Sequence, residues 1–328
     1  MGISIDEKRV YGASEGPTPV YVAGEFGVAR VDTSDDLVGE FGLARRCTAR
    51  DAAGRDGRLA VATDEDVLVG AGDDADGEST AATTFEALDL GPAAAVGFAP
   101  DGRLVVARDD GTVVRRATGG ETADGSESGD WTALGELAGV RAIDGDFLAA
   151  ESGVYRAADD GLTRVGLDDA RDVTAAGVPL AATGEGLFRL GNGWLSERDG
   201  AFRAVAAAEP TTVDDDRPTL PEAHAAGEDG LFAREGGGER TGGEGERSEP
   251  ERRQTSSAGS SRASADDASD GEWRAVDLPV SGDVAALDRG EAGAYAVTED
   301  GTFLLTVGDG WNHQILGLRG VRAVAAPR

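Results

Sequence analysis

The chain has very few residues of several kinds, and each shortage excludes a class of protein. Only one of its 328 residues, Cys47, is a cysteine, so no disulfide can form within the chain. The two histidines, His224 and His313, lie far from Cys47 and from each other in sequence, and no spacing resembles that of a metal site. We therefore expect no metal and no other cofactor.

Long apolar runs are also missing. No stretch approaches the roughly 20 consecutive apolar residues that cross a membrane as a helix. The first ten residues, MGISIDEKRV, do not contain the apolar centre of a secretion signal. These two absences predict a cytoplasmic protein that does not enter a membrane.

Positive charge is scarce, and Lys8 is the only lysine. The chain has 62 acidic and 31 basic residues, and its net charge is −31. Such a surface is typical of a protein that stays hydrated in concentrated salt, where a Debye length of about 3 Å screens its self-repulsion. The alternative is an acidic surface that meets a basic partner. Because a nucleic-acid-binding face needs a basic stripe, we do not expect a nucleic-acid ligand.

One short phrase, an apolar strand followed by an acidic turn and a second apolar strand, recurs seven times. The copies are Tyr21–Val31, Leu59–Val69, Leu104–Arg115, Phe147–Arg156, Pro179–Leu190, Ala223–Arg234 and Ala294–Thr306. They follow one another at intervals of 33 to 45 residues once a polar insert in the last interval is set aside. A period of this size, with two further short strands in each unit, predicts a β-propeller with four strands, a to d, in each blade.

The two ends of the chain predict how the ring closes. Val321–Ala325 reads as a strand a with no blade after it, whereas the first phrase has no strand a before it. We therefore predict a single all-β domain over residues 1–328, a seven-bladed propeller in which the C-terminal strand joins the first blade. Six or eight blades are the alternatives, because the first two units diverge. The stretch Ile5–Val10 is left over and is a candidate for an extra strand at the rim.

The insertions predict two unlike faces. Residues 236–272, within the sixth blade, are rich in Gly, Ser, Glu and Arg and nearly free of apolar residues, which predicts a disordered loop. This loop and the other long insertions all fall in a–b or c–d connections. The b–c and d–a connections are short. We call the two sides of the ring the long-loop face and the short-loop face.

The short-loop face carries the candidate binding residues. Five of the seven units place an arginine near the start of strand a, beside the predicted channel: Arg50, Arg141, Arg171, Arg203 and Arg322. A ring of guanidinium groups could bind a carboxylate or a phosphate. Every b–c turn on this face also has an acid, so structural pairing of each arginine with a turn carboxylate is the favoured interpretation. The recurrent aromatic residue of strand d, as in Trp131 and Trp194, is interpreted as packing between blades rather than as a stacking site.

Two resemblances agree with this fold. Three segments are similar in sequence to the Asp-box repeat of sialidases and of many non-enzymatic propellers. They are Gly153–Thr163, Gly186–Trp194 and, in shorter form, Thr298–Phe303. Ala157 replaces the usual serine, and the second copy has lost its aspartate. The resemblance implies the propeller fold and supplies no enzyme residues.

A second resemblance covers most of the chain. Glu7–Tyr11, Leu37–Arg46 and Gly57–Val69 resemble a family of uncharacterised haloarchaeal β-propeller proteins. This resemblance implies a propeller in a salt-rich cytoplasm and names no ligand.

These observations favour a non-catalytic, monomeric interaction module that binds a protein or a small anionic ligand on its short-loop face. No catalytic residue stands out. The alternative is a sugar-directed hydrolase or lyase with its active site at the channel mouth.

Overall fold

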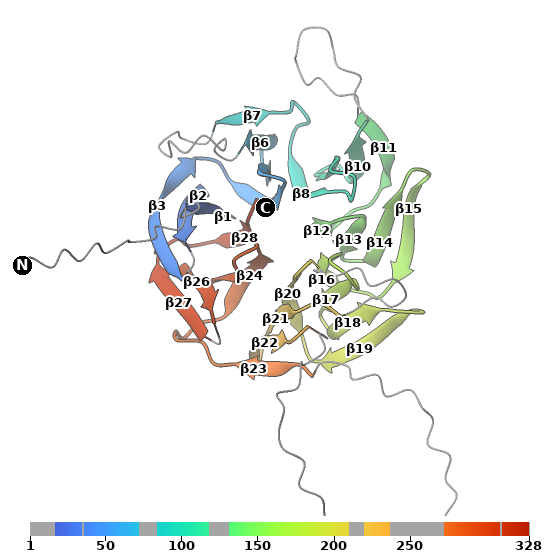
Figure 1. Ribbon diagram of the computed structural model, residues 1–328. Coiled ribbons are helices and arrows are strands. Elements are labelled where there is room, and N and C mark those ends of the chain that lie inside the picture. The colour runs from blue at the N-terminus through green and yellow to red at the C-terminus, as the bar shows by residue number, and fades with distance from the viewer. Residues whose placement is uncertain are drawn as a thin grey trace, which may run out of the picture.

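The computed structural model is a ring of seven four-stranded antiparallel sheets around a central channel (Figure 1). It describes residues 17–34, 36–71, 84–117, 131–209, 220–236, 272–308 and 310–327. The predicted disorder of residues 236–272 and the predicted extra strand at Ile5–Val10 lie almost wholly outside these ranges.

Each blade is a meander whose innermost strand is strand a and whose outermost is strand d. The strands a are β28 (Val321–Ala325), β4 (Ala49–Arg55), β8 (Ala93–Phe98), β12 (Val140–Asp144), β16 (Ala170–Thr174), β20 (Phe202–Ala207) and β24 (Val284–Arg289). The strands b are β1 (Thr18–Gly24), β5 (Arg58–Thr63), β9 (Leu104–Arg108), β13 (Phe147–Ala150), β17 (Leu180–Thr183), β21 (Ala223–Gly227) and β25 (Ala294–Thr298).

The outer half of each blade follows the same order. The strands c are β2 (Gly27–Ser34), β6 (Val67–Ala71), β10 (Thr112–Arg116), β14 (Gly153–Ala158), β18 (Gly186–Leu190), β22 (Gly230–Arg234) and β26 (Thr302–Val307). The strands d are β3 (Leu37–Arg45), β7 (Phe85–Ala87), β11 (Trp131–Glu136), β15 (Gly161–Gly166), β19 (Trp194–Asp199), β23 (Arg274–Val276) and β27 (Gly310–Ile315). Strands β7 and β23 are the shortest of the described strands d, with three residues each.

The ring closes as predicted. Strand β28, at the C-terminal end, pairs antiparallel with β1 and completes the first blade in the order β28-β1-β2-β3. Val22 lies opposite Val324 and Tyr21 opposite Ala325. The first and last parts of the chain thus share one sheet, and the pairing of β28 with β1 closes the ring.

The hydrophobic core is divided among the contacts between neighbouring blades. Seven clusters of buried residues fill the seven interfaces, and alternate residues of each strand face one neighbour or the other. Trp131, Trp194, Trp273 and Trp311 each pack at the interface with the preceding blade. The aromatic residues of strand d therefore serve inter-blade packing, as the sequence indicates.

Glycines shape the tight b–c turns. Gly27 and Gly301 have φ angles of 114° and 83°, which are favourable only for glycine. A Cβ atom at either position would lie 2.0 Å from a carbonyl oxygen, that of Arg45 or Leu318. These glycines keep the b–c turns compact, and the connections on the short-loop face are therefore short.

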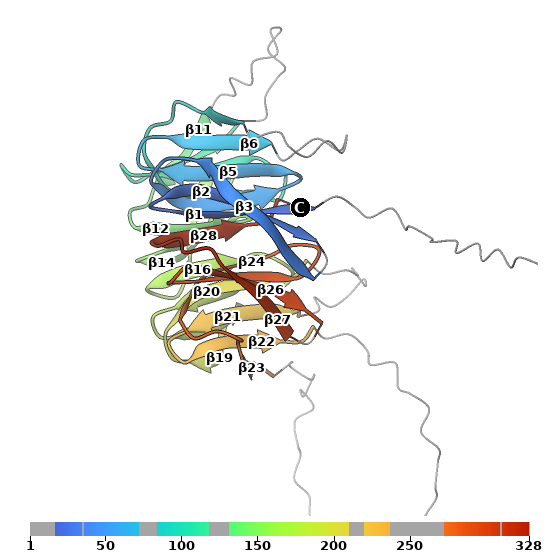
Figure 2. The same cartoon turned by 90° about the vertical axis from the view of Figure 1, so that its left-hand side faces the viewer.

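Figure 2 shows the propeller from its side, with the blades stacked as layers. In the part of the chain that the structure describes, no helix has the length and apolar character needed to cross a membrane.

Candidate functional site

The five predicted arginines all lie second in their strand a, beside the opening of the channel on the short-loop face. Four of them, Arg141, Arg171, Arg203 and Arg322, line a cavity of about 170 Å³ along the ring axis. Residues of six strands a surround this cavity, and β8 contributes none. The sequence thus locates the arginines correctly, and the structure brings four of them to one cavity.

Each arginine has a carboxylate partner. Arg141 donates to Asp169 at 2.7 Å, and Arg171 contacts the other oxygen of Asp169 at 3.3 Å. The charge and hydrogen bond of Arg141, with help from Arg171, hold the pKa of Asp169 below its ordinary value. One carboxylate therefore joins the arginines of two adjacent blades.

The other three arginines also pair with carboxylates, each with a different one. Arg322 pairs with Glu25 at 3.0 Å, in the b–c turn of its own blade. Arg50 pairs with Asp109, and Arg203 pairs with Glu299, both in the b–c turn of the next blade. These pairs are partly exposed, so each adds little stability and is screened by salt.

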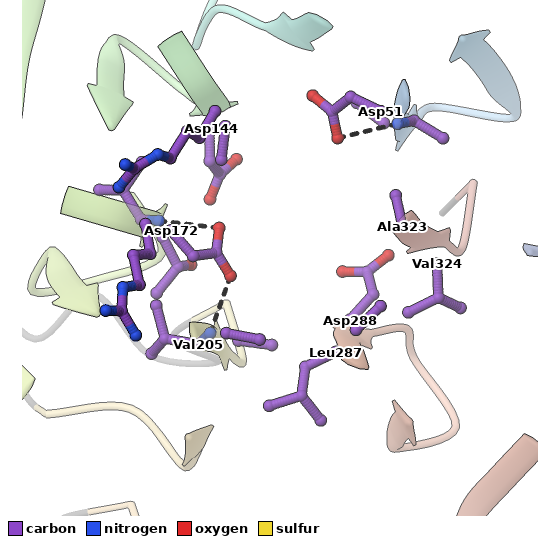
Figure 3. A pocket seen from close by; sticks show the side chains of 18 of the residues that line it. Asp51, Asp144, Asp172, Val205, Leu287, Asp288, Ala323 and Val324 are labelled. Carbon is purple, nitrogen blue, oxygen red and sulfur yellow. Dashed lines mark hydrogen bonds between the residues drawn. The ribbon is translucent and has the colours of Figure 1, made fainter. Parts of the chain in front are cut away.

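Deeper in the channel is a set of acids that the sequence analysis missed. Asp51 and Asp172 occupy the third position of their strands, and Asp144 and Asp288 occupy the fifth. All four line the cavity, and Figure 3 shows their carboxylates directed into it from separate strands. An acid within an otherwise apolar strand is the signal that could have revealed them.

Each of these aspartates connects its own blade to the next one. The Oδ2 atom accepts a hydrogen bond from a backbone N–H of the following blade. The donors are Val96 at 2.9 Å for Asp51, Ala175 at 2.8 Å for Asp144, Val205 at 2.8 Å for Asp172 and Ala326 at 2.8 Å for Asp288. In Asp51, Asp172 and Asp288, the Oδ1 atom also accepts the N–H of the next residue along the chain. We call these four residues the aspartate staples.

Two of the staples hold protons more tightly than ordinary aspartates. Burial raises the pKa of Asp51 and of Asp172 from 3.8 to about 7, against the backbone hydrogen bonds, which favour the ionised form. The negative charges of Asp144 and Asp288 contribute to the rise at Asp172, and that of Asp172 contributes at Asp51. Both side chains border the cavity yet lie deep within the ring, so protein surrounds them on most sides.

The histidines and the cysteine form no common site. His224 is buried against Trp311, and its Nδ1 lies 3.0 Å from a guanidinium nitrogen of Arg289. Burial, and then the charge of Arg289, lower the pKa of His224 to about 4, so the ring is neutral. Within the described ranges, no group of three or more His, Cys, Asp or Glu side chains is placed to hold a metal ion.

Comparison with known proteins identifies the family. A family model described as "Beta-prop_HVO_0234-like, beta propeller" matches residues 4–327. The chain belongs to this family. No curated protein matches it.

Solved structures share the fold at low sequence identity. The WD40 beta propeller domain of Doa1 is 11% identical, with a TM-score of 0.54 over 84% of this chain and 86% of that one. The computationally designed Ika8 protein is 12% identical, with a TM-score of 0.49 over 95% and 91%. Apo AztD from Citrobacter koseri is 10% identical, with a TM-score of 0.47 over 92% and 82%. At 11% identity, the similarity to the Doa1 domain concerns the fold alone. The similarities to Ika8 and AztD are too weak to support an inference.

Proposed function

We propose that this family member is a non-catalytic binding module whose short-loop face receives a protein partner in a salt-rich cytoplasm. The observation that carries the proposal is the pairing of all five channel-mouth arginines with carboxylates of the same or the next blade. A small anion would have to displace those carboxylates from the guanidinium groups. A protein surface with charges of both signs could instead pair with the ring as it stands.

The same pairing weighs against the hydrolase or lyase alternative. An active site for acyl or glycosyl transfer needs carboxylates or cations that are free to act on the substrate. At this mouth the arginines and their acids are engaged with one another.

The Asp-box-like text of Gly153–Thr163 fits a structural role as well. It covers the hairpin of β14 and β15, in which Arg156 pairs with Asp146 at 2.6 Å and the backbone N–H of Ala157 donates to the carbonyl of Asp146. We propose that this degenerate Asp-box stabilises its blade and binds no ligand.

The proposal is tested by affinity purification from the native host in molar salt. The double variant Arg203→Ala/Arg322→Ala changes the short-loop face. The double variant Arg103→Ala/Arg156→Ala is the matched control, because it also removes two ion-paired arginines that are at least partly exposed, but on the long-loop face. We expect a protein that co-purifies with the wild type and the control and is lost with the face variant.

Retention of every partner by the face variant would contradict the proposal. The anionic-ligand alternative has its own measurement, which is calorimetric titration of the wild type with inorganic phosphate and with citrate in molar salt. Binding that disappears in Arg203→Ala/Arg322→Ala would replace the protein partner with a small anion.

A further inference from the structure

The cavity on the ring axis has charged groups at two depths. Four arginines line it at the mouth, and the four aspartate staples line it below them. The staples lie one or three positions further along the innermost strands than the arginines, which is a descent of about 3–10 Å. The cavity of about 170 Å³ is slightly larger than an engineered protein cavity of about 150 Å³ that binds benzene. It therefore has room for the end of one long side chain.

The mouth of this cavity has no excess of positive charge. Its five arginines pair with six carboxylates, which are those of Glu25, Asp109, Glu151, Asp169, Asp283 and Glu299. Below the mouth, the charged groups that line the cavity within the described residues are the four staples. A cation that enters from the short-loop face therefore meets increasing negative charge as it moves inward.

The staples retain capacity to accept hydrogen bonds from a ligand. An ionised carboxylate has about four lone-pair sites, and each staple uses one or two of them for backbone N–H groups. In the part of the chain that the structure describes, the Oδ1 atom of Asp144 accepts no hydrogen bond, because the bond from Ala175 goes to Oδ2. Figure 3 shows the carboxylates of Asp144 and Asp172 directed into the same space. A donor in the cavity thus finds acceptors on separate strands.

The arrangement of these acceptors favours an ammonium group over a metal ion or a guanidinium group. The described acids do not converge closely enough to hold a metal ion. A guanidinium fork pairs best with both oxygens of one carboxylate, but in Asp51, Asp172 and Asp288 both oxygens already accept backbone N–H groups. An ammonium group has three donors on a flexible stem, so it can bind carboxylates of different strands.

We propose that the channel receives the ammonium group of a lysine side chain from the protein partner. This inference rests on the proposed function, since it takes the short-loop face as the docking surface. The side chain passes between the ion-paired arginines of the mouth and donates to the staple carboxylates. The partner is thus a protein with an exposed lysine at the centre of its contact surface.

Calorimetric titration with a blocked Gly-Lys-Gly peptide tests the site without the partner. The full-length protein is kept in the lowest salt concentration at which it stays folded, because salt weakens a charge-dependent contact. We expect a Kd of about 1–10 mM, and at least about tenfold weaker binding when norleucine or arginine replaces the lysine. Equal affinity for either replacement, or no binding of the lysine peptide at about 10 mM, would overturn the proposal.

Neutralising two staples tests where the ammonium group binds. Asp144→Asn/Asp288→Asn removes two carboxylate charges from the cavity, and an amide oxygen remains at each position to accept the N–H of the next blade. We expect this variant to bind the lysine peptide at least about tenfold more weakly than the wild type does. The control Glu40→Gln/Asp160→Asn neutralises two exposed acids away from the channel and leaves the affinity unchanged.

Unchanged binding by Asp144→Asn/Asp288→Asn would refute the site. If that double variant does not fold, Asp144→Asn alone is judged by the same criterion, with a loss of at least about threefold expected.

Co-purification separates this inference from the proposed function. Loss of a partner from both Arg203→Ala/Arg322→Ala and Asp144→Asn/Asp288→Asn would support the inserted lysine. Loss from the arginine variant alone would keep the docking face and refute the inserted lysine. Retention by the arginine variant, together with binding of the lysine peptide that depends on the staples, would support the channel site and contradict the proposed docking face.

Discussion

On three innermost strands, β4, β12 and β16, an arginine of the channel mouth and an aspartate staple lie only one or three residues apart. Their environments are nevertheless opposite. Each arginine has a carboxylate partner and remains partly exposed, whereas each staple accepts backbone N–H groups and lines the channel interior. The comparison separates two ways of joining blades, by exposed ion pairs and by interior carboxylate-to-backbone bonds.

The exposed ion pairs and the carboxylate-to-backbone hydrogen bonds respond differently to salt. An exposed ion pair contributes at most about 1 kcal/mol and loses most of that in molar salt. A hydrogen bond from a buried N–H keeps its value in salt, and removal of its acceptor costs about 1–3 kcal/mol. In a protein with a net charge of −31, the staples therefore give the blades a salt-resistant polar connection beside their apolar contacts.

The largest effect is expected from removal of a staple. Asp172→Ala deprives the N–H groups of Val173 and Val205 of their acceptor. We expect a loss of about 2–4 kcal/mol in the free energy of unfolding at pH 5, similar in dilute and molar salt. Denaturant titration of the variant measures this loss.

Asp229→Ala is the control for that experiment, since Asp229 is exposed in a b–c turn. A change of less than about 0.5 kcal/mol is expected there. Equal destabilisation by the two variants would remove the distinction between staple and surface acid.

A pH dependence of intermediate size is expected from Asp51 and Asp172. Their pKa values are about 7 in the folded protein and near 3.8 in the unfolded chain, so the folded state binds more protons between these values. The corresponding stability is complete below about pH 4 and is lost as the pH rises through 7. We expect the free energy of unfolding to fall between pH 5 and pH 8, because the folded state releases its extra protons over this range.

The double variant Asp51→Asn/Asp172→Asn tests this origin, because an amide keeps an acceptor oxygen and does not titrate. Its unfolding free energy should vary less between pH 5 and pH 8 than that of the wild type. An unchanged slope would assign the pH dependence to other groups.

The sequence predicts the innermost strands and the arginines at the channel mouth, but it does not predict the aspartate staples. The strand a of four blades can be recognised from short apolar stretches with an arginine in second place, such as Val140–Asp144 and Ala170–Thr174, and both match β12 and β16 at each end. The partner of Arg141 could not be identified, because Asp169 lies in a d–a connection and becomes a neighbour only when two blades pack. The staples escaped notice because four aspartates are inconspicuous among 62 acids until the register across blades shows which N–H groups they face.

The smallest effect is expected at the channel mouth. Arg141→Ala removes the 2.7 Å contact with Asp169, but Arg171 continues to contact that carboxylate. Because both partners are partly exposed, the loss in unfolding free energy should be at most about 1 kcal/mol in dilute buffer and smaller still in 2–3 M salt, where the Debye length is about 3 Å or less. Denaturant titrations at the two salt concentrations measure the difference. A loss that persists at high salt would mean that Arg141 joins blades as firmly as the staples do, through its bond to the carbonyl of Ala170 rather than through charge.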